Sequence, residues 1–335
     1  MQSLFHNAYE VLYRDGKWVP SRFTQAQLKA LDGIHEMYGR LGRCTTGVTL
    51  QFVTDAEEIS FQYELGGFYT STGGFDVYEN GVLCANFPLP AKPCRSRFTY
   101  RKQAPGETLL EIALPYHAQC SLWDFSLGNY RPVPPQPGPF LLFCGDSITQ
   151  SAYTSTPSLS FPRLLSRLCG GQYLNRGVGS LYFDASVLDP ADTCRPDVVF
   201  VEFGANDMVM RDESNNVVFK DGKAEYYTEE KLPWLLSRAD AYLEKAARIY
   251  SGARICCITV LWSANEAPQW RRDMQEAFRT GVERICRERG LTCIDGRTLT
   301  PHLAQCYAAD GTHLNALGGA LAAQNLYLAL NNQKT

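Results

Sequence analysis

The first part of the chain alternates apolar and polar residues over short stretches. Every second residue is apolar in 48–52 and in 59–65, and the pair Asn80-Gly81 separates two strand-like stretches within 75–83. Such alternation is typical of half-buried antiparallel strands, and Asn-Gly is a strong hairpin signal. Further strand-like stretches are 98–102, 108–114 and 121–127. Apart from a possible short helix over 24–31, the pattern predicts an antiparallel β-sandwich of the jelly-roll kind.

A proline-rich stretch then interrupts the alternation. Residues 131–139 contain five prolines, which cannot join a helix or a central strand and which favour a stiff, extended connector. The sequence therefore predicts an N-terminal β-sandwich domain over 1–131, a linker over 132–139 and a second domain over 140–335.

The pattern of the second domain changes to alternating strands and helices. Apolar runs fit buried strands at 141–144, 173–175, 197–203, 254–261 and 291–294. Helical spacing of apolar residues occurs at 160–168, 235–250, 274–285 and 315–330. This order predicts an α/β fold with a parallel sheet of about five strands and helices on both faces.

Candidate chemical groups follow the ends of several of these strands. Ser147 follows the first, Ser180 lies beyond the second, Asn206 follows the third, and His313 comes after the last. Because parallel strands end at the same edge of a sheet, these loops are expected to meet there. A serine hydroxyl needs a base to become a nucleophile, and we expect His313 to be that base and Asp310 to orient its imidazole.

The second requirement of acyl transfer is a set of donors aimed at the developing oxyanion. The candidates are the backbone N–H of Ser147, a backbone N–H at Gly179 or Ser180, and the side-chain amide of Asn206. An amide side chain suits this role because it donates a hydrogen bond without carrying a charge.

Four sequence blocks resemble those of the SGNH (GDSL-type) hydrolase family. They are Gly-Asp-Ser-Ile-Thr at 145–149, Asn-Arg-Gly-Val-Gly-Ser at 175–180, Gly-Ala-Asn-Asp at 204–207 and Asp-Gly-Thr-His at 310–313. The resemblance implies a three-layer, doubly wound sheet and a Ser147, His313 and Asp310 triad. The family usually has glycine at the position of Ser180, so the choice between Gly179 and Ser180 stays open.

The order of the two domains is similar to that of the family 2 carbohydrate esterases, which remove acetyl groups from plant polysaccharides or their oligosaccharides. This resemblance implies hydrolysis of short acyl esters, most of all O-acetyl groups on carbohydrates, through an acyl-Ser147 intermediate. A lipolytic or acyl-thioester hydrolase is the alternative within the enzyme class. A catalytically silent sugar-binding protein is the alternative outside it.

Aromatic residues near the predicted catalytic edge are candidates for contact with a sugar ring. Trp262 ends the fourth predicted strand of this domain, and Tyr182 and Phe183 follow Ser180. Aromatic residues at strand ends also commonly belong to the core. The polar segment 151–160 lies just past the nucleophile and fits a loop over the site.

Composition excludes several other classes of function. The formal net charge is −3 and no Lys/Arg stripe occurs, so neither nucleic acid nor an anionic membrane is expected as a partner. No signal peptide or transmembrane segment is evident, and a cytoplasmic location is expected. Several of the twelve cysteines lie in apolar runs, which favours free, buried thiols over a disulfide scaffold. No Cys-x-x-Cys or His-x-x-x-His pair occurs, so no structural zinc site is expected, and no cofactor is predicted. The oligomeric state stays open.

Overall fold

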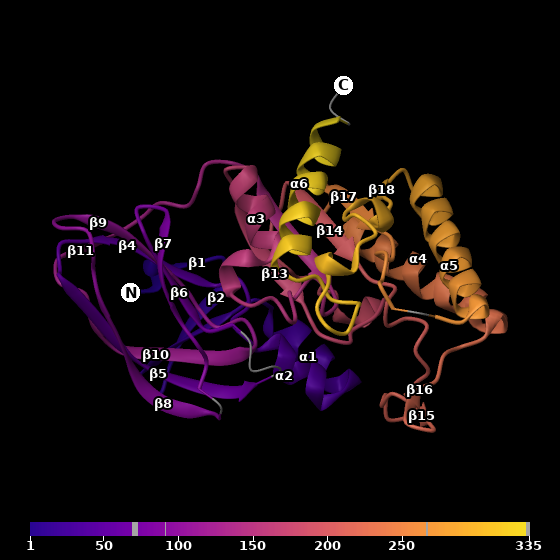
Figure 1. The fold of residues 1–335 in the computed structure, drawn as a ribbon, viewed down its shortest axis with the longest axis horizontal. Coiled ribbons are helices and arrows are strands. Elements are labelled where there is room, and N and C mark those ends of the chain that lie inside the picture. Colours follow the sequence, from indigo (N-terminus) through magenta and orange to yellow (C-terminus); the bar gives the residue numbers. More distant parts are fainter. Residues whose placement is uncertain (69–72, 91, 266, 333–335) are drawn as a thin grey trace.

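The structure is a computed structural model that describes residues 1–68, 73–90, 92–265 and 267–332. Figure 1 shows two antiparallel sheets formed by the first part of the chain, beside a parallel sheet with helices around it. The predicted combination of an antiparallel β unit and an α/β unit is confirmed.

The N-terminal sheets have the strand orders β1-β4-β9-β6-β7, with β11 also paired to β4, and β2-β3-β10-β5-β8. Their strands are β1 (Phe5–His6), β2 (Glu10–Arg14), β3 (Lys17–Ser21), β4 (Thr49–Thr54), β5 (Glu58–Phe68), β6 (Phe75–Glu79), β7 (Val82–Phe87), β8 (Cys94–Arg101), β9 (Thr108–Ala113), β10 (Ala118–Ser126) and β11 (Tyr130–Pro132). Apolar residues of both sheets, such as Phe52 and Phe61, share one core. The jelly-roll connection itself stays a prediction.

The Asn80-Gly81 turn joins β6 to β7 as predicted. Both residues have positive φ, 49° at Asn80 and 85° at Gly81, which is the backbone conformation that a tight hairpin requires. The short strands β1, β2 and β3 were not predicted. They come from an aromatic-rich segment that shows no clear alternation.

The parallel sheet has the order β13-β12-β14-β17-β18. Its strands are β12 (Phe140–Gly145), β13 (Gln172–Gly177), β14 (Val198–Glu202), β17 (Arg254–Ile258) and β18 (Thr292–Ile294), and the helices around it are α3 (Phe161–Leu168), α4 (Leu232–Ile249), α5 (Gln269–Glu288) and α6 (Ala316–Asn332). Side chains alternate between its two faces. Leu142 and Cys257 pack with α4 and α5, while Leu141 and Cys256 pack with α3 and α6. This confirms the doubly wound, three-layer arrangement.

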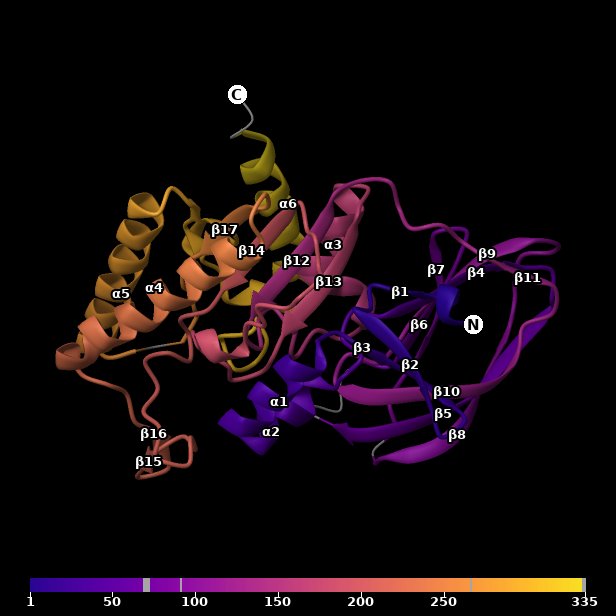
Figure 2. The same ribbon diagram turned by 180° about the vertical axis from the view of Figure 1, so that it is seen from behind.

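Two helices of the N-terminal segment pack with the α/β unit. They are α1 (Gln25–Ile34), which begins with a capping box at Thr24, and α2 (Glu36–Gly42). Leu31 and Tyr38 belong to the same core as residues of α4 and α5. Figures 1 and 2 show α1 and α2 between the β-sandwich and the α/β unit, close to the loops of the latter.

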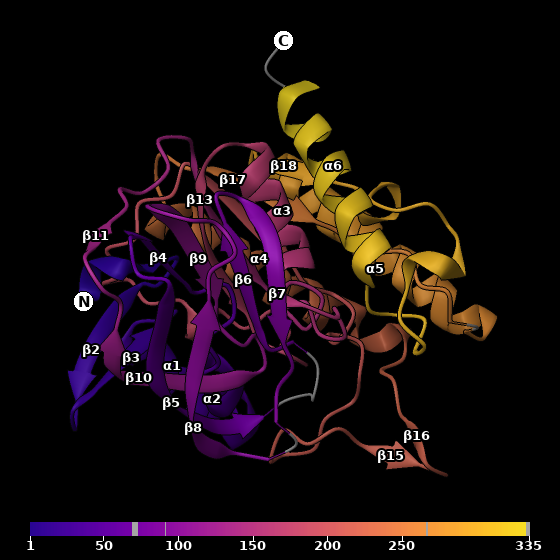
Figure 3. The same ribbon diagram turned by 60° about the vertical axis from the view of Figure 1, so that its left-hand side comes forward.

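Two smaller features complete the fold. Pro132 lies in β11, at the edge of a sheet, where a missing N–H is tolerated. The domain boundaries at 131 and 139 stay a prediction. A hairpin of β15 (Phe219–Lys220) and β16 (Lys223–Ala224) projects from the body (Figure 3). None of the helices in the described ranges combines the length and hydropathy that a membrane crossing needs.

Candidate active site

The catalytic candidates lie in loops at the carboxyl edge of the parallel sheet. Gly145, the last residue of β12, is level with Gly177 of β13 and with Glu202 of β14, so three loops begin side by side. Ser147 lies in the first of them and is almost fully buried. Its Oγ is 2.7 Å from Nε2 of His313, although 166 positions separate the two residues in the sequence.

The carboxylate of Asp310 holds the other side of the His313 ring. Asp310 Oδ2 is 2.5 Å from His313 Nδ1, and Oδ1 accepts hydrogen bonds from the backbone N–H groups of Thr312 and His313. Partial burial alone would raise the pKa of Asp310, but these hydrogen bonds lower it below its ordinary value. Asp310 is therefore ionised at neutral pH and faces the imidazole. The structure brings the three predicted residues into one line of contacts.

Apart from the N–H of Ser147, the oxyanion candidates differ in the hydrogen bonds that they already make. Asn206 uses one amide hydrogen on Asp146 Oδ2, at 2.8 Å, which leaves its second hydrogen available. The backbone N–H of Gly179 donates to the buried Oε1 of Gln150, at 2.7 Å. The N–H of Ser180 has no hydrogen-bond partner among the described residues.

Ser180 adopts a backbone conformation that side-chain-bearing residues seldom use, with φ at 62°. A left-handed conformation at a residue other than glycine costs on the order of 1–2 kcal/mol, so neighbouring contacts must hold it. Its carbonyl accepts hydrogen bonds from the hydroxyl of Tyr38, at 3.0 Å, and from Nη2 of Arg211, at 2.9 Å. Tyr38 comes from α2, so the N-terminal segment helps to fix this loop.

A second N-terminal contact is made by Arg22, which is fully buried. Its guanidinium donates to main-chain carbonyls only: those of Leu41 and Gly42 in the last turn of α2, that of Cys44 after this helix, and those of Asn175 and Gly177 in β13. These bonds tie the end of β13, which leads to Ser180, to the N-terminal segment. Sequence reasoning missed both Arg22 and Tyr38, because an isolated arginine or tyrosine in an irregular stretch usually lies at the surface.

Three buried carboxyl groups lie behind the nucleophile. Asp146, Glu202 and Asp207 are each at most 2% exposed, and Glu202 accepts a hydrogen bond from the hydroxyl of Thr149. Burial raises the pKa of Glu202 to about 7 and that of Asp207 to about 6, and it raises the pKa of Asp146 well above its ordinary value. The negative charge of one ionised carboxylate also disfavours ionisation of its neighbours. The cluster therefore retains protons near neutral pH.

This cluster predicts a pH dependence of stability. Between the ordinary value of 4.5 and about 7, the unfolded chain releases the Glu202 proton while the folded chain keeps it, so the stabilisation from this group is lost as the pH rises. The loss is on the order of 3 kcal/mol. In the Glu202→Gln protein, the free energy of unfolding measured with urea from pH 4.5 to 8 is expected to fall less steeply.

The exposed Glu213→Gln protein is the matched control, and its pH profile is expected to follow the wild type. If the Glu202→Gln and wild-type profiles have the same slope over this range, the proton is not held at Glu202.

Two further residues near His313 were not predicted. The ring of Tyr153 lies 4.7 Å from the imidazole of His313, between centroids, and Tyr153 has a φ of 66°. His117, on the turn between β9 and β10, is fully buried and close enough for the charge of His313 to act on it. Burial lowers the pKa of His117 to about 4, so this ring is neutral at pH 7. The β-sandwich therefore reaches the candidate site.

The three aromatic residues that were predicted to contact substrate lie in different surroundings. Phe183 is fully buried in the core beside Phe203, and Tyr182 is 6% exposed with its hydroxyl bonded to Asn215. Neither offers an open ring face to a ligand. Trp262 is partly exposed, but one face of its ring is stacked on His302, at 4.9 Å between centroids. We do not assign a substrate contact to Tyr182 or Phe183.

Comparison with known proteins identifies the family. A model of the GDSL-like lipase/acylhydrolase family matches residues 143–321, more than half of the chain, and the chain belongs to this family. The matched region contains all four sequence blocks, and the expected SGNH resemblance is confirmed. Among curated proteins, no sequence matches the chain at a significant level.

Solved structures share the arrangement of both units. A salicylyl-acyltransferase, SsfX3, from a tetracycline biosynthetic pathway is 17% identical with a TM-score of 0.79, over 99% of this chain and 94% of that chain. A family two carbohydrate esterase from Cellvibrio japonicus is 14% identical with a TM-score of 0.66, over 98% and 95%. A family two carbohydrate esterase from Clostridium thermocellum, in complex with cellohexaose, is 17% identical with a TM-score of 0.59, over 85% and 91%. At these identities, the likeness establishes the shared fold.

Proposed function

We propose that this chain is a serine esterase that removes short acyl groups, above all O-acetyl groups, from carbohydrates. The observation that carries the proposal is the line of contacts from Asp310 through His313 to Ser147, at 2.5 and 2.7 Å, at the carboxyl edge of the sheet. Nucleophile, base and orienting acid are the three groups that acyl transfer from an ester needs.

The proposed reaction has two halves. Nε2 of His313 takes the proton of Ser147 Oγ as this oxygen bonds to the ester carbonyl carbon, and the same proton then passes to the leaving alcohol as the C–O bond breaks. Water next attacks the acyl-Ser147 carbonyl and gives a proton to His313, which returns it to Ser147 as the carboxylic acid leaves. Asp310 stays ionised throughout and stabilises the imidazolium that forms in each half.

The oxyanion donors in this proposal are the N–H groups of Ser147 and Ser180 and the amide of Asn206. Ser180 is preferred to Gly179 because the N–H of Gly179 already donates to Gln150. Donors that are fixed before the substrate binds need no reorganisation during the reaction. The contacts of Tyr38 and Arg211 to the carbonyl of Ser180 supply that fixation.

Loss of the amide donor gives a direct prediction. The Asn206→Ala protein is expected to have kcat for 4-nitrophenyl acetate lowered by about 10²- to 10³-fold, with little change in KM, because the oxyanion forms only after binding. Steady-state kinetics measures both constants. The exposed Asn129→Ala protein is the control and is expected to match the wild type; a wild-type kcat in the Asn206→Ala protein would remove Asn206 from the proposed oxyanion hole.

Two observations favour a short acyl group on a sugar. Most of the buried residues that follow the nucleophile are polar, namely Thr149, Gln150, Ser151 and Thr154 beside the apolar Ile148 and Ala152, and this composition does not favour a site for a long acyl chain. Carbohydrate esterases, one of them in complex with cellohexaose, share the fold over most of the chain. A lipolytic or acyl-thioester hydrolase would need the apolar surface that this loop lacks.

The test compares substrates directly. Acetylated xylo- and cello-oligosaccharides, 4-nitrophenyl esters of two to twelve carbons, a lysophospholipid and an acyl-CoA are incubated with the wild-type and Ser147→Ala proteins. The proposal expects acetate release from an oligosaccharide, and the highest kcat/KM in the ester series for the acetyl ester. A preference for long chains would favour the lipolytic alternative, and no release from any substrate would favour a silent sugar-binding protein.

A further inference from the structure

Tyr153 places an aromatic ring beside the proposed catalytic base. The ring lies 4.7 Å from the imidazole of His313, between centroids, with 42° between the two planes. Tyr153 is 45% exposed, although its neighbours Ala152 and Thr154 are buried. Within the described part of the chain, its hydroxyl has no hydrogen-bond partner. Both the open side of the ring and the hydroxyl are therefore available to a molecule bound at Ser147.

The backbone at Tyr153 has a conformation that side-chain-bearing residues seldom use. Its φ is 66°, and that of Ser151, two positions earlier, is 62°. Such residues cost free energy, persist only where the surrounding structure imposes the conformation, and cluster at sites that bind ligands. Two of them within three positions indicate that this loop is shaped by function rather than by local stability.

Buried side chains of the β-sandwich hold the segment that carries Tyr153. Asp76 of β6 accepts hydrogen bonds from the N–H of Ser158, at 2.9 Å, and from the hydroxyl of the same residue. The hydroxyl of Tyr116, which follows β9, is 2.7 Å from Oγ of Ser160. All four of these contacting residues are buried. The sandwich therefore fixes the end of the loop that follows the nucleophile.

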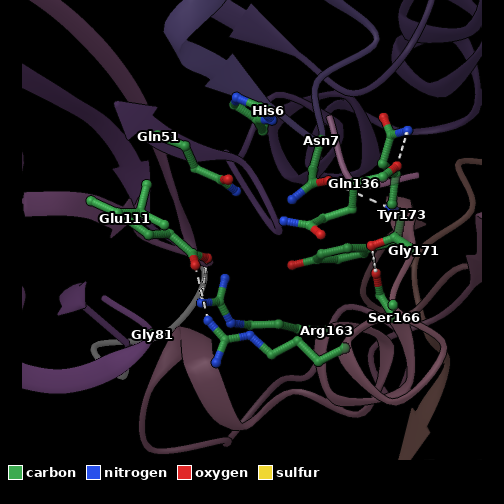
Figure 4. A pocket seen from close by; sticks show the side chains of 14 residues that line it. His6, Asn7, Gln51, Gly81, Glu111, Gln136, Arg163, Ser166, Gly171 and Tyr173 are labelled. Atoms are coloured by element: carbon green, nitrogen blue, oxygen red, sulfur yellow. Dashed lines mark hydrogen bonds and ion pairs between the residues drawn. The ribbon is translucent and has the colours of Figure 1, made fainter. Parts of the chain in front are cut away.

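Helix α3, which begins directly after this loop, is tied to the sandwich as well. Glu111 of β9 pairs with Nη2 of Arg163, at 2.5 Å, and with Nη2 of Arg167, at 2.9 Å (Figure 4). The pairs line a pocket beside Gln172, the first residue of β13, so they lie at the opposite edge of the sheet from Ser147. The loop is thus positioned before a substrate binds, which lowers the entropy lost on binding.

The proposed reaction determines which part of an ester lies beside the Tyr153 ring. In the tetrahedral intermediate the carbonyl oxygen faces the donors of the oxyanion hole, while the leaving oxygen must come within hydrogen-bond reach of Nε2 of His313, which protonates it. A side chain that contacts the imidazole, as Tyr153 does, lies nearer to the leaving alcohol than to the oxyanion. Tyr153 is thus positioned to meet the alcohol part of an ester.

We propose that Tyr153 makes the enzyme selective for esters of cyclic alcohols. Its ring packs against the C–H face of the leaving alcohol, such as a pyranose ring, and its hydroxyl bonds to a hydroxyl of that ring. Aromatic contact area combined with a few polar groups is the usual composition of a small-molecule site. The inference rests on the proposed esterase function and adds to it the residue that distinguishes a sugar ester from the ester of a small alcohol.

The test compares three acetates that differ only in their leaving alcohol: ethyl acetate, cyclohexyl acetate and a mono-O-acetylated methyl xyloside. Ethanol is too small to cover the ring, so Tyr153→Ala is expected to keep kcat/KM for ethyl acetate within about twofold of the wild type and to lower it about tenfold for both cyclic alcohols. Tyr153→Phe should match the wild type on cyclohexyl acetate and lose about threefold on the xyloside, because only the hydroxyl is removed. Tyr130→Ala, at a residue of the sandwich that is 40% exposed, is the matched control and should match the wild type on all three.

Two outcomes would overturn the inference alone. An equal loss for all three acetates in Tyr153→Ala would mean that the ring only positions His313, and unchanged values for all three would mean that it does not contact the alcohol. Labelling of Ser147 by a fluorophosphonate probe shows that each variant is folded, because the leaving group of the probe is too small to contact Tyr153.

Failure of the proposed function gives a different result. A wild type that hydrolyses ethyl and cyclohexyl acetate but not the acetylated xyloside would refute a sugar ester as substrate, while the ratio between the two simple acetates still decides the role of Tyr153. A wild type that hydrolyses none of the three would overturn both proposals.

Discussion

Alanine at Ser147 is expected to lower kcat/KM for 4-nitrophenyl acetate by about 10⁴- to 10⁶-fold. The side chain removed is the one that forms the acyl intermediate, and no other hydroxyl in the line of contacts can replace it. Steady-state kinetics gives the ratio, and a fluorophosphonate probe followed by mass spectrometry gives the labelled residue. The wild type should be labelled at Ser147 and the variant should not be labelled.

The matched control is Ser151→Ala, which removes a buried serine hydroxyl from the same loop and should retain activity within a few-fold of the wild type. Alanine at His313 should be as severe as alanine at Ser147, and the double variant no worse than either, because members of a triad act as a unit. Activity near wild type in Ser147→Ala would end the mechanism proposed above.

The parts of this site that could be predicted are those encoded by short stretches. Ser147, Asn206 and His313 each follow a recognisable element, and the rule that parallel strands end at one edge is enough to bring them together. The Asn80-Gly81 hairpin was predictable for the same reason, since two adjacent residues determine its conformation.

The parts that could not be predicted depend on contacts between distant segments. Arg22 bonds to Asn175 across 153 positions and Tyr38 bonds to Ser180 across 142, and neither has a neighbour in sequence that indicates burial. Helix α2 contains Gly39 and Gly42, which disfavour a helix when considered alone. The Ser180 N–H could not be preferred to that of Gly179 until the contact of Gly179 with Gln150 was known.

The burial of aromatic residues is equally a tertiary property. Phe183 directly follows a catalytic loop, yet it is fully buried beside Phe203 and Tyr242, while Tyr153 in a polar stretch packs against His313. Position along the chain relative to a motif does not say on which side of the backbone a side chain lies. The substrate contacts were therefore the weakest part of the sequence prediction.

The second large effect is expected at Arg22. The Arg22→Met protein keeps a side chain of similar length but removes the guanidinium that donates to five buried main-chain carbonyls. Of the five, the carbonyl of Leu41 keeps a second donor, the N–H of Cys44. A buried acceptor that loses its partner costs about 1–3 kcal/mol, and several of these carbonyls lose theirs together. We expect the free energy of unfolding, measured with urea, to fall by about 3–5 kcal/mol.

The control for this stability effect is Arg43→Met. Arg43 pairs with Asp32 in the same helical segment, but both side chains are more than a third exposed, so its loss should cost about 1 kcal/mol or less. Equal urea midpoints for the two variants would show that the Arg22 network does not hold the fold.

A second contact between the N-terminal segment and the catalytic loops, that of Tyr38, is tested by Tyr38→Phe. This change removes one hydroxyl and keeps the core filled. Loss of the 3.0 Å bond to the carbonyl of Ser180 frees the loop whose N–H is proposed to meet the oxyanion. We expect kcat to fall several-fold at unchanged KM. In Tyr307→Phe, the lost hydroxyl contacts Thr300 instead, and kcat should be unchanged. Equal changes in the two variants would mean that Tyr38 supports only the packing of α2 and not the position of Ser180.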